Sequence, residues 1–309
     1  MILTDAEEKD DEFPLTVYKT PPGNHARQNY NQREIDVIFH EVFPQQQIDP
    51  EKESVGIVTP YDQQRNALQE LFYNTSVKAD TVDKFQGQEK DTIIISTVDN
   101  IITPFADNAQ RMNVAISRAK KRLILVTSSN QKENTNVQDL INYIKYNNYK
   151  VIESNTYSIF DNLYSSYSEH RKLLLKKSRK VSQYDSENLT YMLIEDTLKT
   201  DRFSKLSVTS HVPLRMIISN FKKLSKSENK YVSNVLTHVD FLIFEKLSKK
   251  PILVIEVDGT SFHKKGSRQE VRDKMKNSIL LRYSIPLLRL ATNESKEKER
   301  LISMLNKFC

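Results

Sequence analysis

The chain has 309 residues, enough for about two domains of ~100–200 residues each, and its hydrophobic fraction of 38% can support buried cores. The net charge of +6 fits a nucleic-acid partner, while the single cysteine, Cys309, excludes a disulfide framework or a cysteine-rich zinc site and suits a reducing cytoplasm. No apolar run approaches the ~18 residues that a membrane-spanning helix needs, and the acidic N-terminus does not resemble a signal peptide.

Strands that alternate with helices are predicted over residues 1–150. Three segments are rich in β-branched residues with few polar interruptions, as in a parallel sheet covered on both faces: 54–59, 91–97 and 122–128. Helices are predicted over 31–43, 60–74 and 108–119. The first helix would present Ile35, Ile38, Phe39 and Val42 on one face, and Pro60 would take the first helical position of the second. This alternation predicts a doubly wound α/β domain.

A polar stretch rich in serine and tyrosine follows over residues 151–185. Its segment 171–180 has six basic residues among ten. We interpret the stretch as a basic, solvated helical linker. A contact with the phosphates of a nucleic acid is the sharper alternative.

The remaining residues, 186–309, form a second predicted domain with the order α-β-β-β-α-β. A first helix over 186–199 would begin at Ser186 as N-cap. The other predicted elements are strands 206–212, 233–245 and 251–259, helix 267–283, strand 285–290 and a final amphipathic helix over about 294–308.

Polar residues flank the strands of the first domain, where ligands of open α/β sheets gather. They are Gln64 and Arg65 after strand 54–59, Gly87 and Glu89 before strand 91–97, and Arg118 before strand 122–128. An arginine at such a position can reach across a cleft to a γ-phosphate, as an arginine finger does. Taken singly, each signal is weak, because surface ion pairs and ordinary turn glycines give the same pattern.

Together, and in this order, the strings "VGIVTPYDQQ", "TVDKFQGQEKDTIIIST" and "NVAISRAKKRLILV" resemble motifs IV, V and VI of superfamily 1 helicases. The likeness is to the nonsense-mediated-decay and Dna2-type branch, covers about residues 13–150 and implies a second RecA-like domain. It implies that Gln64 and Arg65 lie near the nucleotide phosphates, Glu89 at the ribose, and Arg118 at the finger position. The residues implied to couple nucleotide to nucleic acid, or to lie on the nucleic-acid side, are Gln86, Gly87, Thr81 and Lys84.

The phosphate-cradling loop of such enzymes is missing. That loop needs a glycine followed by lysine, and none of the five glycines here precedes one. We therefore expect that this chain alone neither hydrolyses ATP nor unwinds nucleic acid. It would be the C-terminal portion of a larger helicase or one half of a split system, with ATP bound only together with RecA-like domain 1, in cis or in trans.

The string "PILVIEVDG" places two carboxylates at the end of an apolar strand. Glu256 and Asp258 are two positions apart and should face the same side, where like charges are costly to bury without a cation. Asp240 lies near the start of the preceding strand, and in a hairpin the start of one strand lies beside the end of the next. Hard oxygen ligands in this arrangement predict that Asp240, Glu256 and Asp258 bind Mg²⁺ or Mn²⁺.

The strings Val239-Asp240-Phe241, "IEVDGTSFH", "VRDKMKNSIL" and "YSIPLLRL" resemble PD-(D/E)xK nucleases, especially restriction-endonuclease-like domains of the very-short-patch-repair type. The resemblance covers about residues 186–295 and implies metal-dependent phosphodiester hydrolysis, with DNA, or alternatively RNA, as substrate. The family's lysine two positions after Glu256 is Asp258 here. His263 is the preferred replacement, with Lys264 and Lys265 as the other candidates.

Further roles follow from the same resemblance. Glu187 would add a ligand or orient water, and Arg272 and Asp273 would form a supporting ion pair. Lys274 and Lys276 would hold the nucleic-acid backbone. Against this stand an ordinary Asp-Gly turn at Asp258 and two alternative functions: an inactive nucleic-acid-binding module of a helicase, and a subunit that completes a split ATPase through Arg118.

Overall fold

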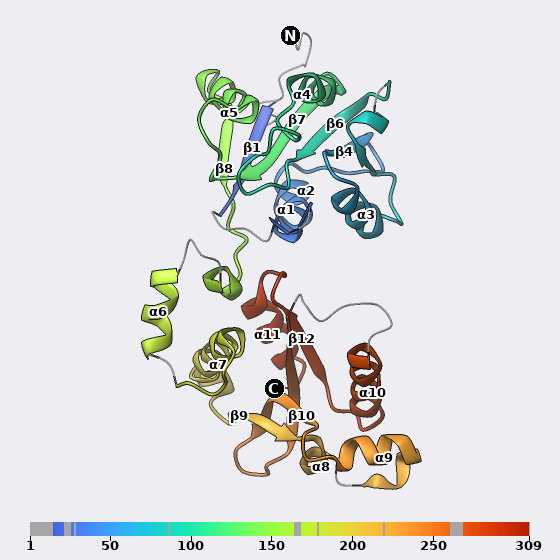
Figure 1. Cartoon of the computed structure of the whole chain (residues 1–309), viewed down its shortest axis with the longest axis vertical. Helices are drawn as coiled ribbons and strands as arrows, with labels where there is room; N and C mark the ends of the chain where they lie inside the picture. Colours follow the sequence, from blue (N-terminus) through green and yellow to red (C-terminus); the bar gives the residue numbers. More distant parts are fainter. Residues whose placement is uncertain are drawn as a thin grey trace. The chain divides into compact units, whose positions relative to one another are not determined.

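The computed structural model describes residues 15–21, 26–27, 29–85, 87–163, 168–177, 179–218, 220–259 and 268–308. The chain divides into two compact units, Met1–Tyr157 and Ser158–Cys309 (Figure 1). The stretch expected as a linker is shared between them: β8 (Lys150–Glu153) pairs in the first sheet, whereas α6 (Ser168–Lys177) belongs to the second unit.

The first unit is built on a six-stranded parallel sheet with the order β5-β4-β6-β7-β1-β8. Its other strands are β1 (Leu15–Thr20), β4 (Val55–Thr59), β5 (Lys78–Thr81), β6 (Lys90–Ser96) and β7 (Ala119–Ser128). The three strands predicted from sequence occupy its centre, where both faces are covered. The predicted α/β class of the first domain is confirmed.

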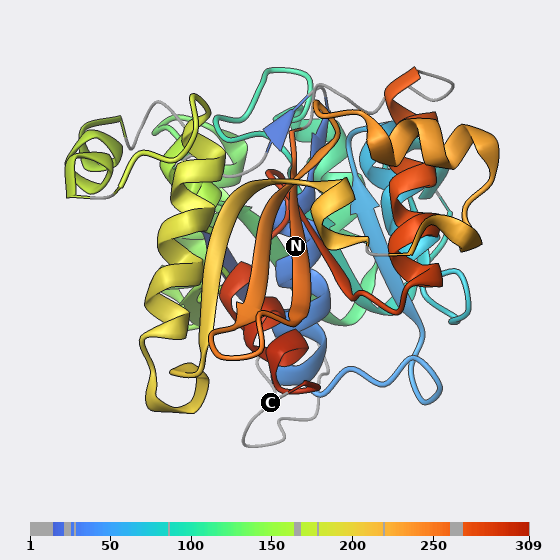
Figure 2. The ribbon, with the colours of Figure 1, turned by 90° about the horizontal axis from the view of Figure 1, so that it is seen from below.

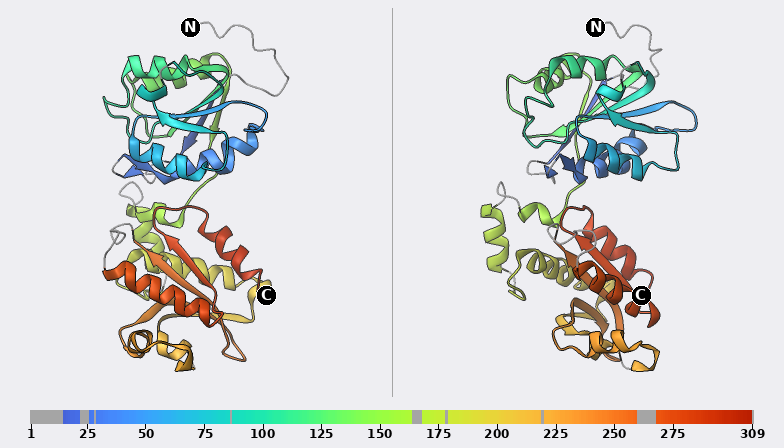
Figure 3. Two further views of the ribbon diagram at one scale, coloured as in Figure 1. Left: turned by 90° about the vertical axis from the view of Figure 1, so that its right-hand side faces the viewer. Right: turned by 45° about the vertical axis from the view of Figure 1, so that its right-hand side comes forward.

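Helices cover both faces of this sheet (Figure 3). One face packs on α4 (Ala109–Ile116) and α5 (Asn136–Tyr146), and the other on α1 (Gln32–Val37) and α3 (Asp62–Leu71). The side chains of Asn108 and Thr135 accept hydrogen bonds from backbone N–H groups in the first turns of α4 and α5, which sets where these two helices begin. Short elements complete the unit: β2 (Ala26–Arg27), β3 (Tyr30–Asn31) and η2 (Asp83–Phe85).

The helix predicted over 31–43 contains a π-helical stretch. After α1, η1 (Ile38–Val42) is π-helical, and α2 (Phe43–Gln45) resumes the α-helix. The wider π turn rotates the following side chains away from the 3.6-residue period. Ile35, Ile38 and Val42 are buried as predicted, but Phe39 is 44% exposed, so its assignment to the buried face was wrong.

Two predicted helix starts were also wrong. Pro60 is not the first residue of α3, which begins at Asp62 after Tyr61 as N-cap. In the second unit, α7 (Asp185–Leu198) begins before Ser186, with Tyr184 as N-cap. Neither cap residue donates or accepts a side-chain capping hydrogen bond, so the usual cap chemistry could not locate these starts.

The second unit is built on a four-stranded sheet with the order β12-β11-β10-β9. Its strands are β9 (Leu206–Pro213), β10 (His238–Glu245), β11 (Pro251–Asp258) and β12 (Leu287–Ala291). The pairs β9–β10 and β10–β11 are antiparallel, and β11–β12 is parallel. With α7 before β9 and α10 (Arg268–Arg282) between β11 and β12, the predicted order α-β-β-β-α-β is confirmed for the core elements. Helices that were not predicted lie between β9 and β10, so the strand expected from residue 233 begins only at His238.

The two faces of this sheet carry different helices. The residues of α7 and α11 (Glu297–Leu305) pack on one face, and those of α10, α8 (Leu214–Ile217) and α9 (Lys226–Ser233) on the other. Figure 2 shows α7 and α10 on either side of the strands. Three further short helices lie within the described part of this unit: η3 (Ile159–Leu163), η5 (Asp201–Phe203) and η6 (Phe221–Lys223). Among the described residues, no helix is both long and apolar enough to cross a membrane.

Candidate functional site

A cavity of about 280 Å³ opens in the second unit where β10 begins and β11 ends. Acidic side chains from four elements line it: Glu187 of α7, Asp240 of β10, Glu256 and Asp258 of β11, and Asp273 of α10. Its basic lining residues are Lys276, Arg272 and His238. The prediction that Glu256 and Asp258 face the same side is confirmed, because both line this one cavity.

Strand register brings Asp240 next to Glu256. Phe241 pairs with Ile255 in the antiparallel ladder, so Asp240 lies one step further, beside Glu256. The backbone N–H of Val257 donates to Asp240 Oδ2 at 2.8 Å. This bond occupies one carboxylate oxygen of Asp240 and fixes its orientation toward the end of β11.

Glu256 is buried against a lysine that comes from the helix packed over it. Lys276 Nζ donates to Glu256 Oε2 at 2.7 Å and to the carbonyl of His238 at 3.0 Å, and both charged residues are under 9% exposed. The other oxygen, Glu256 Oε1, is buried without a hydrogen-bond partner among the described residues. Burial raises the pKa of Glu256 to about 7, with the nearby Asp240 adding to the rise and Lys276 opposing it.

Asp258 is engaged by an arginine from the neighbouring strand. Arg289 of β12 donates to Asp258 Oδ1 at 2.7 Å and lies 3.3 Å from Asp273 Oδ1. The predicted partnership of Arg272 with Asp273 is therefore replaced by an Arg289–Asp273 contact, and Arg272 lies over the ring of Tyr231, 5.8 Å from its centroid.

Glu187 approaches the cavity from α7. Its Oε2 atom is buried without a hydrogen-bond partner among the described residues and lies 3.5 Å from Nε2 of His211. Burial raises the pKa of Glu187, and the charge of Asp240 adds to the rise. The rings of His211 and His238 meet edge to face, 5.3 Å apart, so two imidazoles flank the carboxylates.

The described side chains do not form a preorganised metal site. Within the described ranges, no three His, Cys, Asp or Glu residues are grouped closely enough to hold a metal ion. The oxygens of Glu256 and Asp258 that would serve as ligands are partly used by Lys276 and Arg289. His263, Lys264 and Lys265 lie outside the described residues.

Sequence reasoning missed the roles of Lys276 and Arg289. Lys276 was expected to hold a nucleic-acid backbone, but its ammonium group is buried against Glu256. The signal was present: Lys276 lies three and four positions before Ile279 and Leu280, both buried, so it shares the apolar stripe of α10. Arg289 alternates with buried Leu288 and Leu290, which places it on the face of β12 opposite theirs.

In the first unit, Gln64 does not face an open surface. It is fully buried in the first turn of α3, where its Oε1 accepts from the backbone N–H of Asn31 at 2.8 Å and its Nε2 donates to Ser96 Oγ at 3.0 Å. Its amide therefore links α3 to β6 inside the domain. Arg65 beside it pairs with Asp62 and lies 4.0 Å from Asp80.

The remaining first-unit residues gather where β6 and β7 begin. Gly87 is exposed in a turn with φ +78°, a conformation that favours glycine. Glu89 lies 3.5 Å from Lys120. The guanidinium of Arg118 donates to Val114 O at 3.3 Å and to Ser117 Oγ at 3.1 Å, and among the described residues no carboxylate lies within ion-pair distance of it.

The structure places the remaining predicted positions plainly. Thr81 ends β5 and is half-buried, and Lys84 is exposed in η2. Gln86 lies outside the described residues. Lys274 is exposed on α10.

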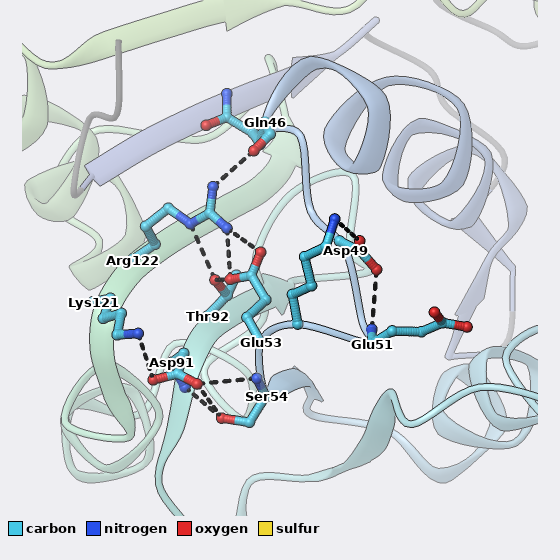
Figure 4. A network of polar contacts seen from close by, with 10 residues as sticks. Gln46, Asp49, Glu51, Glu53, Ser54, Asp91, Thr92, Lys121 and Arg122 are labelled. Carbon is cyan, nitrogen blue, oxygen red and sulfur yellow. Dashed lines mark hydrogen bonds and ion pairs between the residues drawn. The ribbon is translucent and has the colours of Figure 1, made fainter. Parts of the chain in front are cut away.

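A buried polar network anchors the start of β7 next to Arg118 (Figure 4). Arg122 donates to Glu53 Oε2 at 2.6 Å, to Thr92 Oγ1 at 3.1 Å and to the carbonyl of Gln46 at 2.7 Å. These bonds tie the loop before β4 to β6 and β7. The beginnings of β6 and β7, next to Glu89 and Arg118, are thereby fixed relative to each other.

Comparison with known families covers most of the chain in two pieces. Residues 4–130 match a family described as an AAA domain, and residues 180–308 match a family described as a protein of unknown function, DUF2726.

Several curated helicases are similar to parts of the chain. An uncharacterized ATP-dependent helicase of Methanocaldococcus jannaschii is 43% identical over 77 residues, which are 24% of this chain and 12% of that protein. The DNA polymerase alpha-associated DNA helicase A of Saccharomyces cerevisiae is 30% identical over 141 residues, 40% of this chain and 20% of that protein. The DNA replication ATP-dependent helicase/nuclease JHS1 of Arabidopsis thaliana is 38% identical over 84 residues, 25% of this chain and 6% of that protein.

The chain thus spans between 6% and 20% of the length of these relatives. Among solved structures, the C-terminal domain of a possible DNA helicase from Lactobacillus plantarum WCFS1 aligns with a TM-score of 0.32 and 15% identity, over 45% of this chain and 85% of that one. A TM-score of this size does not establish a shared fold. The family match and the curated relatives show that the chain carries a region similar to the C-terminal region of superfamily 1 helicases.

Proposed function

We propose that the chain is the C-terminal portion of a DNA helicase-nuclease whose second unit hydrolyses phosphodiester bonds with the help of a divalent metal. The observation that carries the proposal is the cavity in which carboxylates from α7, β10 and β11 meet a buried lysine. Buried like charges are costly, and a fold keeps them together where a ligand compensates them. The similarity to a protein named as a helicase/nuclease adds support.

The cavity offers the type of ligand that suits Mg²⁺ or Mn²⁺, but its described carboxylates are not grouped closely enough to hold an ion as they stand, so a bound ion would have to draw them together. Two buried carboxylate oxygens, Glu256 Oε1 and Glu187 Oε2, lack hydrogen-bond partners among the described residues. Burial raises the pKa of both glutamates, and the charge of Asp240 adds to the rise. Hard oxygen ligands of this kind suit these cations. Asp240, Glu256 and Glu187 would hold the metal, which when bound polarises the phosphate and lowers the pKa of a bound water.

Other side chains of the second unit would have supporting roles in this reaction. Lys276, rather than a residue two positions after Glu256, would supply the positive charge beside Glu256, where its buried ammonium group offsets negative charge next to the attacking water. Asp258, first expected as a metal ligand, would instead hold Arg289 in place through the bond at 2.7 Å. His263 and Lys265 stay candidates from the sequence and lie outside the described residues.

For the first unit we propose half of a nucleotide site. The guanidinium of Arg118 has no carboxylate partner among the described residues and lies at the start of β7, which suits a finger for ATP held by a RecA-like domain 1, in cis or in trans. Glu89 and Gly87 border the same strand ends. Gln64 would act indirectly, because its amide holds α3 to β6.

Cleavage of labelled single- and double-stranded DNA, without ATP, tests the proposed hydrolysis. We expect the chain to cut in Mg²⁺ or Mn²⁺, to stop in chelator, and to lose cutting in Glu256→Gln. Glu34→Gln is the matched control, because Glu34 is an equally buried glutamate of the first unit. Cutting by Glu256→Gln at the wild-type rate would refute the assignment.

One observation favours a second candidate, a nucleic-acid-binding module without catalysis. The pairs Lys276–Glu256 and Arg289–Asp258 already compensate part of the buried charge without a metal. DNA binding without cleavage in either metal, and without a metal-dependent rise in melting temperature, would select this candidate. A rise that disappears in Asp240→Asn would reject it.

A further inference from the structure

We propose that residues 214–236, which join β9 to β10, form a docking surface for the phosphate backbone of a nucleic acid beside the carboxylate cavity. We call this segment the basic insertion; it comprises α8, η6 and α9. The inference deepens the proposed function and rests on it, since the docked backbone would present its phosphodiester to that cavity.

The basic insertion carries an excess of positive charge. It holds five basic residues and one acidic residue in its sequence. The basic residues are Arg215, Lys222, Lys223, Lys226 and Lys230, all exposed. The one acid, Glu228, accepts a hydrogen bond at 2.8 Å from Arg282 and another from the backbone of Ser225, so its charge is compensated inside the structure.

The basic insertion, which carries these exposed cations, packs firmly against the rest of the unit. Leu214, Ile217 and Val232 are buried against α10 and the sheet. Arg282 Nη1 donates to the carbonyl of Lys223 at 2.9 Å, and the hydroxyl of Tyr283 donates to the carbonyl of Asn220. The ammonium groups of Lys222, Lys226 and Lys230 have no ion-pair partner among the described residues, which leaves them available for an anion.

The C-terminal end of the basic insertion borders the cavity. Tyr231, Leu236 and Thr237 line the cavity together with Arg272 of α10. Leu236 and Val235 are 79% and 59% exposed, so the segment that carries the lysines also brings apolar surface to the edge of the cavity. Nucleic-acid-binding surfaces combine cations that contact phosphates with apolar side chains that contact sugars or bases.

A merely solvated helix face explains this surface less well. A face built for solubility mixes both signs of charge, whereas the basic insertion leaves cations alone outside. A protein with an acidic surface is the other occupant that such charge would attract. Nucleic acid is favoured because the cations adjoin a cavity that is itself proposed to hydrolyse phosphodiesters.

The test is equilibrium binding of labelled duplex DNA, single-stranded DNA and RNA to the full chain in chelator, so that no cleavage occurs. The test variant is Lys222→Gln/Lys226→Gln/Lys230→Gln. The control is Lys205→Gln/Lys249→Gln/Lys250→Gln, which removes the same charge at the opposite end of the strands, where Lys246 N–H donates to Lys205 O. Circular dichroism confirms that both variants fold.

We expect the test variant to bind at least one of the three nucleic acids ~10-fold or more weakly than wild type. The slope of log affinity against log salt should fall by about one for each phosphate that the variant no longer neutralises. The control should keep the wild-type affinity and slope. Equal affinities and slopes for the two variants would overturn the docking surface, as would displacement of bound DNA by polyglutamate as effectively as by unlabelled DNA.

Failure of the two proposals can be told apart. Hydrolysis of a small phosphodiester, bis(p-nitrophenyl) phosphate, by the wild-type chain in Mn²⁺ tests the chemistry without docking. Loss of binding in the test variant supports the docking surface whether or not that small substrate is hydrolysed. Hydrolysis of the small substrate, with equal binding by both variants, would reject the docking surface alone.

Discussion

A fully or nearly buried glutamate lies in each unit, and the hydrogen bonds of its carboxylate differ between the two units. Glu34 of the first unit accepts hydrogen bonds from Ser96 Oγ at 2.6 Å, the backbone N–H of Val98 at 2.9 Å and Thr97 Oγ1 at 3.2 Å. Glu256 of the second unit has one oxygen on Lys276 and the other without a partner among the described residues. Burial raises the pKa of both, to about 8 and about 7.

The contrast separates structural from functional burial. Glu34 holds the backbone of Val98, a β-branched residue with φ 71°, and so keeps a strained turn after β6 in place. Glu256 lines a cavity beside other carboxylates. A raised pKa is therefore common to both roles, and the site is distinguished by an unsatisfied oxygen on a residue that lines a cavity.

The largest expected effect concerns the first unit's dependence on a partner. In a protein that contains both RecA-like domains, we expect Arg118→Ala to lower ATP hydrolysis ~10³-fold, because an arginine finger stabilises the charge that develops in phosphoryl transfer. Steady-state ATPase rates measure the loss. Lys121→Ala is the control, since Lys121 lies in the same region but pairs with Asp91 at 3.4 Å. An unchanged rate in Arg118→Ala would contradict the proposal that the first unit contributes half of a nucleotide site.

The next effect is a pH dependence of stability in the first unit. Because the pKa of Glu34 in the folded chain, about 8, lies above its usual value, its contribution to stability is complete below about pH 4.5 and is lost as the pH rises through 8. Glu34→Gln carries no such proton. Its stability relative to wild type should therefore increase with pH over this window, by on the order of 5 kcal/mol.

Hydrogen exchange of amides in β6 and β7 measures this difference for the first unit alone. A relative stability that stays flat with pH would mean that Glu34 is ionised in the folded chain.

A comparable loss, of activity rather than stability, is expected at Glu256. Glu256→Gln should lower metal-dependent hydrolysis at least ~100-fold, because loss of a metal ligand should cost at least as much as loss of a group that supports one, which costs ~10–100-fold. Its stability should change little, because the amide oxygen can still accept from Lys276. Cleavage rates and melting temperatures of the same preparation test both statements. A variant that unfolds as it loses activity would make Glu256 another structural glutamate like Glu34.

The smallest effect is expected at Lys276. Lys276→Met should reduce hydrolysis ~10-fold or more, and Lys276→Arg should restore part of it by returning a positive charge. The pH profile of cleavage should also shift in Lys276→Met, since Lys276 lowers the pKa of Glu256. Loss of the positive charge lets that pKa rise, so activity should move to higher pH. An unshifted profile would assign Lys276 a purely structural role.

Local patterns in the sequence predicted a large part of the fold. The central strands β4, β6 and β7, the α-β-β-β-α-β order and the meeting of Asp240 with Glu256 follow from strand periodicity and hairpin geometry, which act over a few residues. Strand β1, between β7 and β8, was not predicted because its six residues, LTVYKT, include two threonines and a lysine and so give no continuous apolar run.

Long-range packing decided the chemistry of the cavity. Lys276 reaches Glu256 because α10 packs its apolar stripe on the sheet, and Arg289 reaches Asp258 because β12 pairs in parallel with β11. The burial of Gln64 likewise depends on contacts with Asn31 and Ser96, each over thirty residues away. The sequence by itself determined which residues carry charge and which strands are buried. Only the tertiary structure decided which charges compensate one another, because that depends on distances between elements remote in the chain.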